Sequence, residues 1–200
     1  MIKFLRFTAI FLTFWSCSST SGELSNYFES TQITELNQLT EFVVNELTAD
    51  CEGNRTDCLK SYFDQFKNSG YDFELGISKS KQAELLNSLS ESTYDNIWST
   101  CRGTRSFSRD SVVNILSICP NMKGGFTNFL TSYCAKTDRL TSYGDAFEQA
   151  GSYSPAMNAQ LIKNPDSFNF NSEAELLLIS VHLITLNNED KIVESVPNKR

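Results

Sequence analysis

Histidine is almost missing from this sequence of 200 residues, in which His182 is the only one. The sequence also lacks a Cys-x-x-Cys pair, so the ligand spacing of a zinc site fails. A Gly-x-x-x-x-Gly-Lys phosphate loop is absent as well. These absences remove the common patterns for binding a metal or a nucleotide, and no cofactor is expected.

The single histidine also restricts nucleophilic catalysis, because any Ser-His-Asp or Cys-His arrangement must use it. Neither a Gly-x-Ser-x-Gly elbow nor a papain-like cysteine segment accompanies His182. Val181 and Leu183 flank it within a strongly apolar segment, which predicts a neutral histidine in the core. The alternative is a cleft in which His182 pairs with Cys134 or with a serine.

An excess of basic residues is also absent. Seventeen Lys and Arg stand against 24 Asp and Glu, which gives a net charge of -7. A nucleic-acid surface needs clustered Lys and Arg, so no nucleic-acid partner is expected. The acidic balance suits a protein of the cell envelope that is kept in solution by its charge, or one that docks on a basic partner.

What the sequence does have is an apolar leader. Lys3 and Arg6 precede the apolar run from Phe7 to Trp15, which is long enough for a signal peptide and too short for a membrane span. The run stops at Ser16 and Cys17 and continues into small polar residues. The pattern predicts a signal peptide over residues 1–16.

Cys17 after an apolar run resembles the lipobox of bacterial lipoproteins. The resemblance implies cleavage before Cys17 and acylation of that cysteine, for example with palmitate, so that the membrane is a partner through a lipid anchor. Ser18 resembles the signal for sorting to an outer membrane, and the domain then faces either the periplasm or the cell surface. The alternative is a secreted protein cut near Gly22, with Cys17 discarded.

Beyond the leader, the sequence predicts one all-α domain of about eight short helices clipped by disulfides. A polar tether is expected over 17–30, the helical domain over 31–188 and a flexible polar tail over 189–200. One helix is expected over 31–49, and segment 71–78 is interpreted as a packed loop. Further helices are expected to start near Leu59, Ser78, Ser90 or Ser92, Ser108, Phe126, Asp138, Ser154 and Ser172.

Two of these expectations concern residues 90–120. A helix from Ser90 or Ser92 is expected to carry Tyr94, Ile97, Trp98 and Cys101 on one face and to stop at Gly103. The next helix, capped by Ser108, is expected to hold Val112, Val113, Leu116 and Cys119 and to end at Pro120.

The helix after Ser172, with Glu175 completing a capping box, is apolar nearly all round and is expected to run through the core.

Five cysteines remain beyond Cys17, and in an oxidising compartment most of them are expected to pair. Cys51 and Cys58 bracket a hydrophilic segment that contains a glycine, which favours a bridge between them. The second bridge is expected between Cys101 and Cys119, or between Cys119 and Cys134, which leaves one thiol free.

Three constellations are candidates for function. The segment that holds Arg102, Arg105 and Arg109 is the one basic island, either a partner-binding surface or a loop paired with nearby acids. Tyr94 and Trp98 are candidate anchors for a partner. Glu74, flanked by Tyr71 and Phe73, and Asp95 are the candidate carboxylates of a glycan-cleaving site.

The sequence thus favours a non-enzymatic envelope lipoprotein that binds a protein partner, for example an immunity or inhibitor protein against a toxin or a lytic enzyme. The alternatives are an envelope enzyme that acts on glycan or peptidoglycan and a structural surface lipoprotein.

Overall fold

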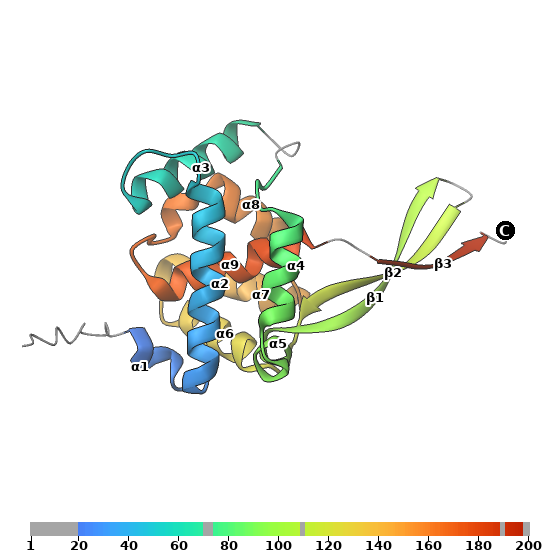
Figure 1. Cartoon of the computed structure of the whole chain (residues 1–200), viewed down its shortest axis with the longest axis horizontal. Helices are drawn as coiled ribbons and strands as arrows, with labels where there is room; N and C mark the ends of the chain where they lie inside the picture. The colour runs from blue at the N-terminus through green and yellow to red at the C-terminus, as the bar shows by residue number, and fades with distance from the viewer. Residues whose placement is uncertain (1–19, 70–73, 109–110, 189–190, 198–200) are drawn as a thin grey trace, which may run out of the picture.

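The computed structural model describes residues 20–69, 74–108, 111–188 and 191–197. They form a helical body from which a three-stranded antiparallel arm projects (Figure 1). The body consists of α1 (Thr20–Leu24), α2 (Ser30–Thr48), α3 (Arg55–Ser69), α4 (Lys79–Ser88), α5 (Glu91–Ile97), α6 (Gly125–Ala135), α7 (Thr141–Ala150), α8 (Pro155–Lys163) and α9 (Glu173–Asn187), with short 3-10 turns at Asp138–Leu140 and Pro165–Ser167. The arm consists of β1 (Trp98–Ser108), β2 (Ser111–Pro120) and β3 (Lys191–Pro197).

The centre of the body is α9. Every residue from Ala174 to Ile184 is buried, so this helix runs through the core, as its apolar sequence predicts. Ser172 caps it by accepting a hydrogen bond from the Glu175 backbone N–H. The Glu175 carboxylate does not return to Ser172 to complete the expected capping box, because it instead accepts hydrogen bonds from the Tyr133 hydroxyl and the Asn169 N–H.

The helices around α9 begin and end largely where local signals in the sequence place them. Ser78, Ser90 and Ser154 each accept a hydrogen bond from a backbone N–H in the first turn of α4, α5 and α8, respectively. Gly151 ends α7 in the left-handed conformation, with φ at 63°, which favours glycine. The mostly helical fold is therefore confirmed.

The chain is not all-α, however. The helix expected to run from Ser90 to Gly103 ends at Ile97, and the helix expected from Ser108 to Pro120 does not form. Instead, β1 and β2 pair as a long hairpin from Trp98 opposite Pro120 outward. Gly103 lies inside β1 instead of stopping a helix. The valines and isoleucines of β2 are β-branched, and such side chains are enriched in strands.

The expected tail also folds differently, since Lys191–Pro197 is β3 and pairs antiparallel with β2. At the other end, the expected polar tether contains α1, and its residues Leu24 and Phe28 are buried in the core. The ring of Phe28 lies edge-on to Phe129, with 6.3 Å between their centroids. The tether prediction is therefore wrong from Thr20 onward, because Leu24 and Phe28 are part of the hydrophobic core.

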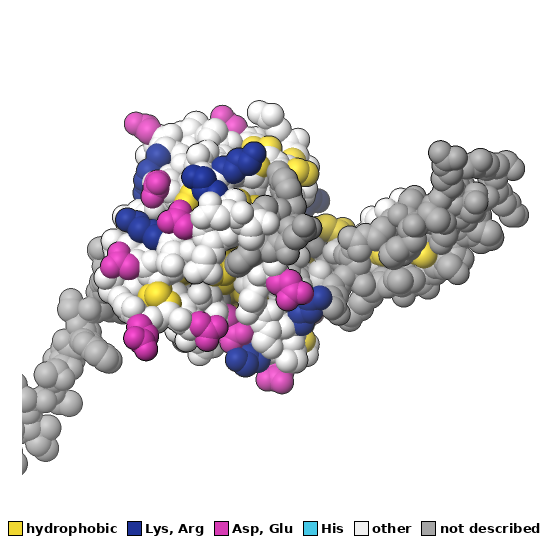
Figure 2. Space-filling model, turned by 90° about the horizontal axis from the view of Figure 1, so that it is seen from above, with side chains coloured by type: hydrophobic (Ala, Val, Ile, Leu, Met, Phe, Trp, Pro, Cys, Tyr) yellow, Lys and Arg dark blue, Asp and Glu magenta, His cyan; other side chains and the backbone are white. Residues whose placement is uncertain are grey.

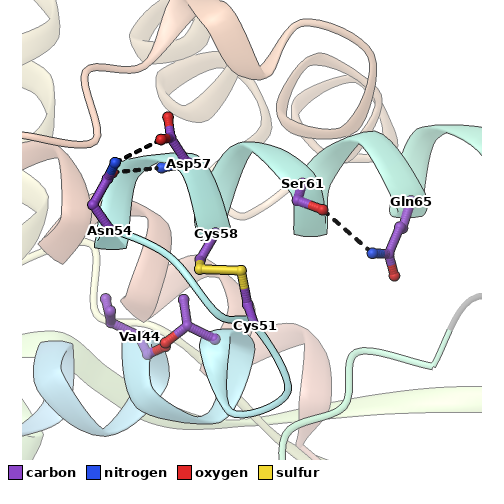
Figure 3. Close-up of a disulfide and its surroundings, with 8 residues drawn as sticks. Val44, Cys51, Asn54, Asp57, Cys58, Ser61 and Gln65 are labelled. Carbon is purple, nitrogen blue, oxygen red and sulfur yellow. Dashed lines mark hydrogen bonds between the residues drawn. A yellow bond between two sulfur atoms is a disulfide. The ribbon is translucent and has the colours of Figure 1, made fainter.

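Two disulfides form among the described residues. Cys51 joins Cys58 across the turn between α2 and α3, with the Cα atoms 5.7 Å apart (Figure 3). Beside it, the Asn54 side chain caps α3 by accepting a hydrogen bond from the Asp57 N–H. Cys101 joins Cys119 within the arm, which decides between the two pairings left open above, and Cys134 is a free, buried thiol.

Candidate functional site

A groove of about 700 Å³ lies where the arm joins the body. Its walls come from α4, α5, the inner ends of β1 and β2, and the C-terminal end of α9. Its apolar side chains are Ala83, Leu86, Leu89, Tyr94, Leu116 and Ile118; its polar lining residues are Lys79, Gln82, Asn87, Glu91, Thr100, Ser117, Asn187 and Asn188. Apolar and polar side chains thus line the groove together.

Two carboxylates of α2 hold the helices that form one wall. Glu46 accepts hydrogen bonds from the Lys81 ammonium at 2.7 Å and from the Ser78 N–H at 3.0 Å, which lower the pKa of Glu46. Glu35 accepts from the Ser90 hydroxyl at 2.7 Å and from its N–H at 3.2 Å. Both carboxylates therefore fix the first turns of α4 and α5 relative to α2.

An amide pair, buried Gln82 and half-buried Asn187, belongs to the lining of the groove. The Gln82 side chain is 3 % exposed and donates to the Ile184 carbonyl at 3.1 Å. The Asn187 side-chain amide donates to the side-chain oxygen of Gln82 at 2.8 Å and to the backbone carbonyl of Ile77 at 3.1 Å. These bonds attach α4 to the end of α9, and no local sequence signal predicts them because the partners lie about one hundred residues apart.

The base of the arm is also fixed to the body. The Asn121 N–H donates to the Ile97 carbonyl at 2.8 Å, and the Asn121 amide donates to the Asp95 carbonyl at 2.6 Å. A Cβ atom added at Gly124 would lie 2.2 Å from the Asn96 carbonyl oxygen, so only glycine fits there. The inner ends of β1 and β2 are thereby held at a defined position on α5.

One face of the hairpin continues from the groove along the arm. Thr100 pairs with Ile118, and Arg102 pairs with Leu116, so these four side chains share a face of the sheet. Arg102 is exposed. Arg105 takes a strand position of the opposite parity, paired with Val113, and Arg109 lies outside the described residues. Two of the three arginines of the basic island therefore lie in strand β1 and not in a loop.

The two aromatic anchor candidates have different positions. Tyr94 is half-buried and lines the groove, and burial raises the pKa of its hydroxyl. Trp98 is fully buried, with its indole N–H donating to the Thr185 hydroxyl at 2.9 Å. The prediction that Trp98 binds a partner is therefore wrong, because Trp98 is a core residue. Its ring packs against that of Tyr94, with 5.6 Å between the ring centroids.

His182 is a core histidine, as its apolar flanks predict. Its Nε2 lies 2.7 Å from the side-chain amide oxygen of Asn158, and its Nδ1 lies 2.8 Å from the Tyr143 hydroxyl. Because the Asn158 oxygen only accepts, Nε2 carries the proton and Nδ1 accepts from Tyr143. Burial lowers the pKa of His182 to about 3, and burial raises that of the Cys134 thiol to about 12. Neither side chain reaches solvent as a nucleophile or a base.

The two candidate carboxylates lie at the surface, and Tyr71 and Phe73, which flank Glu74 in the sequence, lie outside the described residues. Glu74 and Asp95 are both exposed, whereas a general acid of a glycosidase sits in an apolar pocket. Across the described ranges no group of three His, Cys, Asp or Glu side chains is placed to hold a metal ion. None of the helices in those ranges combines the length and apolarity of a membrane span.

No family model, curated protein or solved structure matches the chain. Any function is therefore argued from the groove and the arm themselves.

Proposed function

We propose that this chain is a non-enzymatic lipoprotein of the cell envelope that is anchored through Cys17 and binds a protein partner with its β-arm. The observation that carries the proposal is the arm itself, which projects from one side of the helical body while α1 lies on the opposite side (Figure 1). Cys17 precedes Thr20 by three residues, or roughly 10 Å of chain. An anchor at Cys17 would thus leave the arm pointing away from the membrane.

The distribution of charge supports a binding role for the arm. The body segments, residues 20–97 and 121–188, contain nine Lys and Arg against twenty Asp and Glu. The hairpin, residues 98–120, contains three arginines against one aspartate. Figure 2 shows acidic and basic side chains interspersed over the face of the body seen from above, without a hollow of one charge. The arm is thus a basic projection on an acidic body.

An inhibitor or immunity protein is the more specific form of this proposal. A projecting arm is convex, and its natural complement is a concave surface such as the cleft of a toxin or a lytic enzyme. The exposed positions of Glu74 and Asp95 and the burial of His182 remove support from the alternative of an envelope hydrolase.

The experiment places a photo-crosslinking amino acid at Thr104, which is exposed on β1, or at Lys60, which is exposed on α3. The full chain is expressed in its own cell and irradiated. We expect a discrete protein adduct from Thr104 and none from Lys60. Adducts from both positions alike, or from neither, would contradict binding through the arm.

The anchor has a separate test. Labelled palmitate should enter the wild-type chain and not the Cys17→Ser variant, which should also leave the membrane fraction. If the variant keeps the label and its location, the lipoprotein part of the proposal is wrong, whatever the arm binds.

A further inference from the structure

The outer side of β1 is an open sheet edge. The strand order β1-β2-β3 leaves β1 paired with β2 on one side, and no other strand in the described ranges pairs with its other side. β1 is eleven residues long, whereas the opposite edge, β3, has seven residues and ends in a proline. A long edge without proline offers a row of backbone donors and acceptors to another chain.

We propose that an extended, acidic segment of a partner protein adds to the β1 edge as a fourth, antiparallel strand. The inference rests on the proposed binding role of the arm and names the class and the mode of the partner. Backbone hydrogen bonds along an added strand supply affinity, and pockets for alternate side chains supply specificity.

The charge of β1 selects an acidic segment. Arg102 is exposed on the face that continues from the groove, and Arg105 holds a position of the other parity. An added strand therefore runs past arginine positions of both parities. Side chains on paired strands interact across the pair, and opposite charges stabilise it.

The groove supplies the pocket for an alternate side chain. Thr100 lies two residues before Arg102 on the same face and lines the groove with Tyr94 and Ile118. A residue opposite Thr100 would have its side chain directed to this half-apolar hollow. In an antiparallel addition, the partner sequence that matches these three positions reads Glu-x-x-Glu-x-Leu, from opposite Arg105 to opposite Thr100.

A second copy of this chain fits the same edge poorly. A two-fold pairing of β1 with itself, centred on Gly103, places the two copies of Arg102 in diagonal positions on one face. Diagonal neighbours lie about 7–8 Å apart, so the pairing brings like charges together. The same basic edge that attracts an acidic strand thus disfavours self-association.

The test uses the full chain and the peptide acetyl-Thr-Glu-Thr-Thr-Glu-Thr-Leu-Thr-amide, with a control peptide in which lysines replace both glutamates. Binding is followed by the amide NMR signals of the protein. We expect the acidic peptide to shift the signals of β1 and the lysine peptide to leave them unchanged. The variant with Arg102→Glu and Arg105→Glu should bind the acidic peptide about tenfold more weakly and accept the lysine peptide, while Lys60→Glu should behave as wild type.

Two N-methylated forms of the acidic peptide separate strand addition from charge attraction. One carries methyl groups on the odd-numbered amides and the other on the even-numbered amides. Because only alternate amides of an added strand face β1, one form should bind and the other should not. Equal binding of the two forms would overturn the proposal.

Other outcomes decide the remaining alternatives. The inference is contradicted if the signal shifts are confined to the helices, or if the acidic and the lysine peptide bind equally well. It is also contradicted if the full chain sediments as a dimer that the peptide does not dissociate. If the Thr104 adduct forms while the peptide fails, the arm binds its partner by another mode and only this inference falls. If the adduct is absent as well, the proposed function falls with it.

Discussion

Acid should destabilise this fold through His182, and the size of the effect follows from its burial. The ring is completely buried, stacks on Tyr153 at 4.1 Å between centroids, and bonds to Tyr143 and Asn158 in its neutral form. Burial lowers its pKa from 6.5 to about 3. Between these two values the unfolded chain binds a proton that the folded chain excludes, so the free energy of unfolding falls as the pH falls.

Above pH 6.5 both states are neutral at this residue, and the full stability is present. Each pH unit below that value costs about 1.4 kcal/mol until the folded state binds the proton near pH 3. The loss at pH 5 is then about 2 kcal/mol. Hydrogen bonds lower the pKa values of Glu35 and Glu46 from 4.5, so these carboxylates stay ionised at pH 5 and contribute little to the difference.

The assay is urea unfolding of the wild type and of His182→Gln at pH 7.5 and pH 5. The variant is expected to be less stable at both pH values, but its stability should change little between them. The reasoning is refuted if the wild type is equally stable at the two pH values, or if the variant loses the same 2 kcal/mol, estimated from the single-proton linkage, as the wild type.

Three further predictions concern the packing of the body and the arm. Replacing Cys101 and Cys119 by serine should lower the free energy of urea unfolding by about 3 kcal/mol, and replacing Cys51 and Cys58 should lower it by about 2 kcal/mol. The difference follows because the bridged residues are 18 and 7 positions apart, respectively. An equal or smaller loss for the Cys101–Cys119 bridge would contradict the loop-closure argument. Gly144→Ala should lose about 1–3 kcal/mol instead of gaining from the better helix propensity of alanine, since its Cβ would lie 2.6 Å from that of Cys134; a gain in stability would show that α6 and α7 can separate. Glu175→Gln should lower the melting temperature by about 6 °C, because it weakens the bonds of a buried carboxylate; an unchanged midpoint would mean that the carboxylate is dispensable.

The parts of the fold that the sequence predicts are those set by local chemistry. Serine caps at Ser78, Ser90 and Ser154 act on the next few backbone N–H groups, so they are visible in a short window. The burial of α9 follows from its composition alone. The bridge between Cys51 and Cys58 likewise joins residues that are neighbours in the chain.

The sequence does not predict the arm, because its strands are stabilised by pairing between residues that lie far apart in the chain. Val112, Leu116 and Cys119 recur at spacings that also fit a helix face, and only pairing with β1 and with β3, more than seventy residues later, decides for a strand. The groove is hidden for the same reason. Its walls come from helices and strands spread over more than one hundred residues, and Gln82 gives no local sign that it is buried.

Amide hydrogen exchange of β1, in the free full-length chain and in its partner complex captured through Thr104, tests the central claim most directly. In the free chain, alternate amides of β1 should exchange fast, because every second N–H points away from β2. In the complex these same amides should become protected. If the exchange of β1 stays unchanged and new protection appears on the helical body instead, the arm is not the binding element and the account is wrong.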